Sequence, residues 1–269
     1  MASNLDVAAA PQAGVAMKGR WMQLVLGVIC MMAAANIQYA WTLFVPKIAE
    51  TFKWELAAIQ WTFTIFVLVQ TWLTPFEGWL VDRLGPRWLV LFGGLLTGAA
   101  WVVYSYADSL NMYYLGAVIA GLGVGCVYST AINNAIKWFP DKRGLAVGLT
   151  AGGYGIGSAL TIIPIDNMIR AGMFKEAFFY FGLAQGAIIM LAALMLRAPR
   201  KGEVPKSTRI VQSAHDYTLG EAARTPLFYL LFIMFVLTVT GGLMAVAQLG
   251  PIAKDLKVKD VPIDLGFIV

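Results

Sequence analysis

The chain has 269 residues, of which 59% are hydrophobic and only 13% charged, and its mean hydropathy is +0.70. An average soluble domain carries about 25% charged residues, so this composition excludes an ordinary soluble domain and predicts a polytopic membrane protein. The net charge of +5 comes from basic residues lying between the apolar runs. This distribution argues against nucleic-acid binding.

Seven apolar stretches are each long enough to cross a hydrocarbon core of about 30 Å as a helix. They cover residues 21–46, 56–77, 88–107, 112–136, 144–165, 177–197 and 227–252. We therefore expect an all-α membrane protein. Its expected parts are an N-terminal tail (1–20), a six-helix transmembrane bundle (21–197), a polar linker (198–226) and the start of a second transmembrane half (227–269).

Basic residues are distributed unevenly between the two sides of these predicted helices. The side that holds the N-terminus carries 13 of the 20 lysines and arginines. By the positive-inside rule this side faces the cytoplasm, which predicts a multi-pass protein of the cell membrane with a cytoplasmic N-terminus. We expect this membrane to be a bacterial inner membrane. Both cysteines fall in apolar spans and the single histidine, His215, falls in the linker. We expect no disulfide, no metal site and no cofactor.

The string Gly78-Trp-Leu-Val-Asp82-Arg83-Leu-Gly85-Pro-Arg87 lies between the second and third apolar runs. Its charges cannot lie in hydrocarbon, so it marks a short turn at the membrane surface. The pattern G-x-x-x-D-R-x-G-x-R resembles the loop between helices 2 and 3 of the major facilitator superfamily. That resemblance implies two six-helix halves, each an inverted 3+3 repeat, with substrate bound between them. We expect Asp82 to pair with an arginine and with a helix N-terminus as a gating latch, and Arg83 and Arg87 to contact helix ends or lipid headgroups.

A second charged turn, Lys137-Trp-Phe-Pro140-Asp141-Lys142-Arg143-Gly-Leu-Ala, separates the fourth and fifth runs. Pro140 is expected to end one helix and Asp141 to N-cap the next, which leaves Lys142 and Arg143 at the headgroups.

Together with the following Gly148-Leu-Thr-Ala-Gly-Gly-Tyr-Gly-Ile-Gly, this turn resembles the oxalate–formate antiporter branch of that superfamily. Residues 37–43, 123–128 and 224–228 resemble it too, and the similarity extends from Arg20 to about Asp255. It implies a twelve-helix exchanger of small carboxylates, with the basic substrate ligands in the second half. On that plan the chain would be truncated about five helices early.

Helical spacing places Thr150, Tyr154, Ser158 and Thr161 within about 80° of one another, which predicts a polar stripe on the fifth span. A separate ridge of Gly144, Gly148 and Gly152 is suited to close approach by a neighbouring helix.

Several hydrogen-bond donors lie near the middle of their spans, away from the membrane interfaces. A buried phenol needs a partner, and a carboxylate is a good acceptor. The candidate substrate ligands are Gln38, Tyr39, Trp41, Tyr128 and Tyr154, and the resemblance supports aromatic residues from helices 1, 4 and 5 in this role. Glu77 is the one acidic residue inside an apolar run, and we expect it to act in gating or ion pairing rather than as a proton relay.

These observations favour a secondary transporter that exchanges oxalate- or formate-like anions, acting as a monomer in the lipid bilayer and not as an enzyme. A lactate-like monocarboxylate carrier or a drug exporter on the same fold is an alternative, as is a membrane protein that does not transport. A seven-helix retinal protein is disfavoured, because residues 225–253 contain no lysine for a Schiff base.

Overall fold

The computed structural model describes residues 13–200, 202–204 and 217–255, and the chain divides into two compact units, residues 1–206 and 207–269. The second unit holds α10 (Leu219–Ala222) and α11 (Pro226–Asp255), which covers the predicted seventh span. The first unit holds α1 (Ala13–Ala34), α2 (Asn36–Tyr39), α3 (Trp41–Phe52), α4 (Leu56–Trp72), α5 (Thr74–Leu84), α6 (Pro86–Tyr106), α7 (Leu110–Trp138), α8 (Arg143–Arg170) and α9 (Phe174–Met195).

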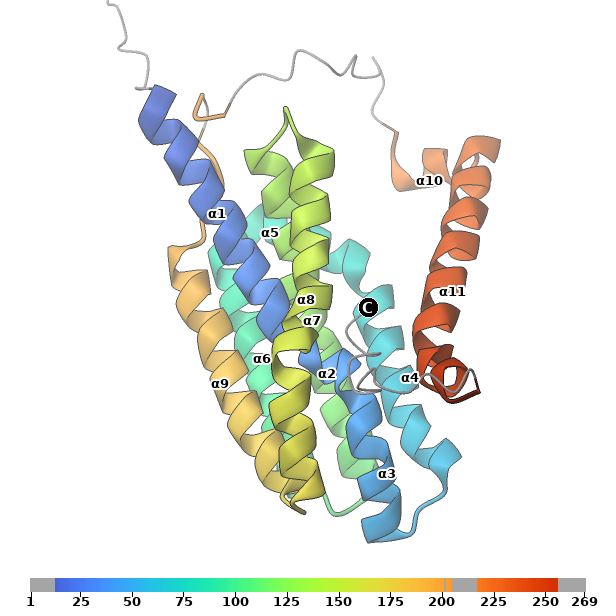
Figure 1. The fold of residues 1–269 in the computed structure, drawn as a ribbon. Coiled ribbons are helices and arrows are strands. Elements are labelled where there is room, and N and C mark those ends of the chain that lie inside the picture. Colours follow the sequence, from blue (N-terminus) through green and yellow to red (C-terminus); the bar gives the residue numbers. More distant parts are fainter. Residues whose placement is uncertain (1–12, 201, 205–216, 256–269) are drawn as a thin grey trace, which may run out of the picture. The chain divides into compact units, whose positions relative to one another are not determined.

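The first unit is a bundle of long helices (Figure 1). Five of its helical segments are long and apolar enough to cross a membrane: Gly19–Phe52, Pro86–Tyr106, Leu110–Trp138, Arg143–Arg170 and Phe174–Met195. Helices α4 and α5 together make a sixth span with a bend of 51° between them. These six spans coincide with the first six that the sequence predicts.

Two of the six spans are broken, whereas the sequence pattern predicted continuous helices. The α-helix of the first span is interrupted at Ala35 and again at Ala40, which separates α1, the single turn α2, and α3. Both residues keep right-handed helical backbone angles. The second span bends at Leu73, two residues before Pro75. Proline lacks an N–H and its ring crowds the preceding turn, so the bend has a local cause. Both breaks lie inside apolar runs, where hydropathy alone carries no sign of them.

The helix pairs that pack in the first unit follow a repeat. The first span (α1) packs on the fifth (α8), and the second (α4) packs on the fourth (α7). The first also packs on the sixth (α9), and the third (α6) on the fourth. Exchanging spans 1, 2 and 3 with spans 4, 5 and 6 converts the contact between spans 1 and 5 into the contact between spans 4 and 2. It likewise converts the contact between spans 1 and 6 into the contact between spans 4 and 3. The contact between the third and sixth spans, α6 on α9, maps onto itself. The packing therefore has the symmetry of a 3+3 repeat.

Glycines bring these helices close together. A Cβ on Gly186 of α9 would stand 3.0 Å from the Cα of Gly98 of α6, and a Cβ on Gly153 of α8 would stand 2.8 Å from Val28 of α1. The predicted ridge of Gly144, Gly148 and Gly152 is wrong for this unit, because no atom of the described residues lies within 4 Å of a Cβ there. The small residues that meet α1 lie instead on the side of α8 that carries the polar stripe.

Candidate substrate site

Four of the five predicted ligands form one cluster, to which α2, α7 and α8 contribute. The Tyr154 hydroxyl donates a hydrogen bond to Gln38 Oε1 at 2.9 Å. The ring of Tyr39 meets that of Tyr154 edge-on, with centroids 5.6 Å apart, and the ring of Tyr128 does so at 5.4 Å. Edge-to-face contacts at these distances are favourable. We call Gln38, Tyr39, Tyr128 and Tyr154 the tyrosine cluster.

The polar stripe of α8 positions this cluster. Thr161 donates a hydrogen bond to Asn36 Oδ1 at 2.7 Å, about two turns along α8 from the bond between Tyr154 and Gln38. The two bonds hold both ends of α2, the short turn between the breaks of the first span. The irregular backbone thus presents Gln38 and Tyr39 in fixed positions, and irregular backbone inside a membrane protein is tolerated where neighbouring groups satisfy it.

The cluster has a buried side and an open side. Tyr154 is 5% exposed, whereas Tyr128 is 36% exposed and Gln38 and Tyr39 are half-buried. Within the described part of the chain, the hydroxyls of Tyr39 and Tyr128 donate no hydrogen bond, and the Gln38 amide nitrogen donates none. Three neutral donors are therefore free on one surface, which can accept an anion but cannot neutralise its charge.

Sequence reasoning missed two amides near this cluster. Gln70 of α4 lies within hydrogen-bonding reach of Tyr154, and Asn36 anchors α2 as described. Both are polar amides in the middle of apolar runs, the same signal that singled out Gln38. The predicted polar stripe consists of hydroxyl-bearing residues that share a helical face, and it therefore leaves out Asn36 and Gln70.

Trp41 lies outside the tyrosine cluster. Its ring packs against Tyr104 and Tyr113, with centroid distances of 5.7 and 6.2 Å, and it is 4% exposed. Two residues along a helix are about 200° apart around its axis, so Trp41 faces α6 and α7 where Tyr39 faces the cluster. Trp41 is therefore only two residues from Tyr39 in the chain but does not join it in the tyrosine cluster.

The predicted motif residues lie at one end of the first unit, which we call the basic end: residues 78–87, 137–143, 195–200 and 202–203. Asp82 pairs with Lys137 of α7 at 2.6 Å. The predicted arginine partner and helix N-terminus are wrong, because α5 packs on α7 and brings Asp82 to the last turn of that helix. This ion pair joins the second and fourth spans at their exposed ends.

The arginines of the same turn have other contacts. Arg87 Nε donates a hydrogen bond to the carbonyl of Leu196 at 3.3 Å, just beyond the end of α9, as predicted for a helix-end contact. The guanidinium of Arg83 lies over the Trp79 ring at 4.1 Å. Gly85 has φ +80° and ends α5, a conformation that L-residues rarely adopt. A Cβ at Gly78 would meet no atom within 4 Å in the described part.

Asp141 also departs from its predicted role. It accepts two hydrogen bonds from Arg20 Nη1, at 3.0 and 3.2 Å, and the residue at the N-cap of α8 is Lys142. Arg20 is only 5% exposed and lies over the Phe139 ring at 4.7 Å. A buried guanidinium without a charged partner is more costly than a helix end without a side-chain cap. This difference explains why Asp141 pairs with Arg20 and does not cap α8. Lys142 and Arg143 are exposed, as expected.

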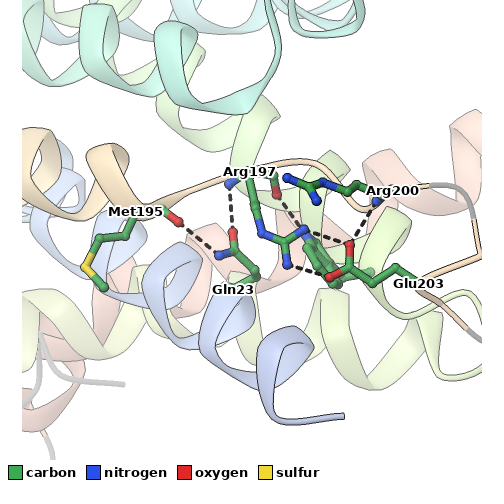
Figure 2. A network of polar contacts seen from close by, with 6 residues as sticks. Gln23, Met195, Arg197, Arg200 and Glu203 are labelled. Carbon is green, nitrogen blue, oxygen red and sulfur yellow. Dashed lines mark hydrogen bonds and ion pairs between the residues drawn. The ribbon is translucent and has the colours of Figure 1, made fainter. Parts of the chain in front are cut away.

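Residues 195 and 197 are fastened to Gln23 of α1 and to the last residue of α7, and Figure 2 shows the contacts of Gln23. Gln23 donates to the carbonyl of Met195 at 3.0 Å and accepts from the Arg197 N–H at 2.8 Å. Trp138 Nε1 donates to the Arg197 carbonyl at 2.9 Å. These side chains satisfy orphan groups beyond a helix C-terminus. We call this arrangement, with Glu203, the linker clasp.

Glu203 closes the clasp by accepting two hydrogen bonds from Arg197, at 2.7 and 2.5 Å, and one from the Arg200 N–H at 3.0 Å. The hydrogen bonds from Arg197 are the main reason that the pKa of Glu203 falls to about 2. The described residues contain no group of three or more His, Cys, Asp and Glu side chains that could hold a metal ion.

Residues 24–269 match the family model of the Major Facilitator Superfamily. The chain is 39% identical over 238 residues to the oxalate:formate antiporter of Oxalobacter formigenes, which covers 88% of this chain and 56% of that protein. It is 29% identical over 244 residues to the MFS-type transporter YhjX of Escherichia coli (strain K12), 90% of this chain and 60% of that one. It is also 27% identical over 212 residues to human monocarboxylate transporter 11, an alignment that covers 78% of this chain and 44% of that protein. The chain thus spans about half the length of these relatives. Because the match covers nearly all of its predicted and observed helices, the chain belongs to the Major Facilitator Superfamily.

Proposed function

We propose that this protein is a secondary transporter that exchanges small carboxylate anions, and that the tyrosine cluster forms one wall of its substrate site. The observation that carries the proposal is the group of three free donors on the open side of the cluster: the hydroxyls of Tyr39 and Tyr128 and the amide of Gln38. Hydrogen bonds from such donors to a carboxylate are charge-assisted and about twice as strong as neutral ones. The similarity to the oxalate:formate antiporter supports the same substrate class.

The wall that these residues form would orient an anion without neutralising it. In this superfamily the substrate lies near the midplane, between two halves of the fold. The cations that balance a dicarboxylate would therefore come from the second half. A site whose cations are left unpaired when it is empty is costly to close, which favours crossing with substrate bound, and hence exchange, over net transport.

The basic end would act as the gate at the cytoplasmic face, with the N-terminus on the same side. The distribution of basic residues supports this orientation. The pair formed by Asp82 and Lys137 would latch the second span to the fourth in the conformation described here, and the bend between α4 and α5 gives α5 a place to hinge. We further propose a monomer that spans the bacterial inner membrane in several passes and catalyses no chemical reaction.

A monocarboxylate carrier is the second candidate, because the chain is also similar to human monocarboxylate transporter 11. A single carboxylate would need fewer of the three donors. Counterflow separates the two candidates. Liposomes that contain the full-length protein are loaded with unlabelled oxalate, and uptake of labelled oxalate, formate and lactate is measured. We expect oxalate and formate to exchange. Exchange of lactate without oxalate would favour the second candidate, and no counterflow of any of the three would contradict both.

A further inference from the structure

Glu77 is a buried acid that the proposed substrate site does not use. It lies on α5, where that helix packs on α7, and it is 3% exposed. Neither carboxyl oxygen has a hydrogen-bond partner in the described part of the chain. The sequence favoured gating or ion pairing for Glu77 over a proton relay, and the structure shows no ion pair for it among the described residues.

The carboxyl group packs directly on the backbone of α7. A Cβ on Gly125 would lie 3.0 Å from Glu77 Cδ and 3.1 Å from Oε2, and closer still to Oε1. Gly125 thus makes room for the acid. The nearby Ser129 hydroxyl is already committed, because it donates to the Gly125 carbonyl at 2.8 Å.

The basic groups on the neighbouring helices are engaged elsewhere. Lys137 of α7 pairs with Asp82 at 2.6 Å, and Arg87 of α6 donates to the Leu196 carbonyl. On α5 itself, Arg83 lies over Trp79. Residues 56–72 of α4 contain no charged side chain, and the titratable neighbour on α7 is Cys126, a buried thiol. Among the described residues, no basic side chain pairs with Glu77 in this contact.

An ionised carboxylate without a partner is costly to bury in a protein interior and more so within a membrane. We infer that Glu77 is a proton-binding site: it holds a proton while α5 packs on α7 and releases the proton to water when α5 swings away. Because the protonated acid is the form that fits the contact, low pH stabilises the closed arrangement and high pH favours its opening. This couples the gate at the basic end to protons, independently of which carboxylate the protein carries.

Infrared spectroscopy of the purified chain in lipid nanodiscs tests this directly, since a protonated carboxyl and a carboxylate absorb in separate regions. At neutral pH we expect the spectrum of the wild type to contain a protonated-carboxyl C=O band that shifts in D2O. The variant Glu77→Gln should lose that band. The matched control, Glu176→Gln, alters an exposed acid and should lose carboxylate bands only.

Loss of carboxylate bands in Glu77→Gln, with the protonated-carboxyl band retained, would overturn the inference. The wild type provides a second test that does not depend on the folding of the variant. Glu77 is the only buried acid among the residues whose burial is described. A wild-type spectrum without any protonated-carboxyl band at neutral pH would therefore also overturn the inference. Neither measurement requires transport, so failure of carboxylate exchange and failure of this site are read separately.

Discussion

The hydroxyl of Tyr154 donates to Gln38 Oε1 at 2.9 Å, and this bond ties the polar stripe of α8 to the broken part of the first span. With its oxygen occupied, the Gln38 side chain has its amide nitrogen left to donate. Tyr154 therefore acts in two ways, as a buried support for Gln38 and as the ring on which Tyr39 and Tyr128 pack.

Removing a free hydroxyl should weaken substrate binding. In Tyr39→Phe the ring contacts remain, and the loss of one hydrogen bond to a carboxylate costs about 1–3 kcal/mol. Since about 1.4 kcal/mol is tenfold, oxalate should bind roughly 5- to 150-fold more weakly in counterflow. Tyr106→Phe is the matched control, because Tyr106 is exposed and is the last residue of α6, a helix that contributes nothing to the tyrosine cluster. This variant should bind oxalate as the wild type does. Equal affinity of Tyr39→Phe and the control would remove Tyr39 from the site.

Breaking the second anchor of α2 should lower stability as well as binding. Thr161→Val leaves Asn36 Oδ1 buried without its donor, which costs about 1–3 kcal/mol. Thermal unfolding in detergent measures this loss. Thr64→Val is the control, because Thr64 is exposed and bonds only to the Gln60 carbonyl on its own helix. If both variants unfold at the wild-type temperature, Asn36 and Thr161 do not fix α2.

Asp82→Asn should slow exchange without preventing insertion. The ion pair with Lys137 is partly exposed, with side-chain exposures of 67% and 43%, so its loss should change stability by no more than about 1 kcal/mol. Its effect should fall on the rate at which the gate closes. The reversed pair, Asp82→Lys with Lys137→Asp, should restore part of the rate. Wild-type exchange rates in Asp82→Asn would count against a latch.

The linker clasp should open in acid. Because the pKa of Glu203 is lowered to about 2 from 4.5, the ionised group stabilises the folded state above pH 4.5, and this contribution is lost as the pH falls toward 2. Glu203→Gln should therefore unfold at a lower temperature than the wild type at pH 6, and the difference should shrink below pH 4.5. A difference that stays constant down to pH 3 would mean that the Glu203 charge does not hold the clasp.

The spans and the tyrosine cluster could be predicted because hydropathy and helical spacing depend only on the sequence of a single helix. Tyr154 and Thr161 share a face whatever surrounds them, and packing then determines only what that face meets. The interruptions at Ala35 and Ala40 could not be predicted, because no proline or glycine lies at either position. The bend at Leu73 has a local cause in Pro75, which hydropathy alone does not register. The exclusion of Trp41 from the cluster follows from helical spacing, which puts residues 39 and 41 on opposite sides of the first span.

Charge partners were the least predictable part of the basic end. Asp82 and Asp141 were identified as important, but their partners, Lys137 and Arg20, lie 55 and 121 residues away in the chain. Local rules favoured a helix cap for Asp141. Burial of Arg20 outweighed that preference, and burial is a property of the assembled bundle.

The central claim is that the open side of the tyrosine cluster faces the transported carboxylate, and protection from chemical modification tests it most directly. Cys30 and Cys126 are buried, so a thiol reagent applied to Tyr128→Cys in the full-length protein should report on residue 128. We expect oxalate to slow its modification over the concentration range that supports counterflow, and to leave the exposed control Tyr106→Cys unprotected. Modification of Tyr128→Cys at the same rate with and without saturating oxalate would contradict the account.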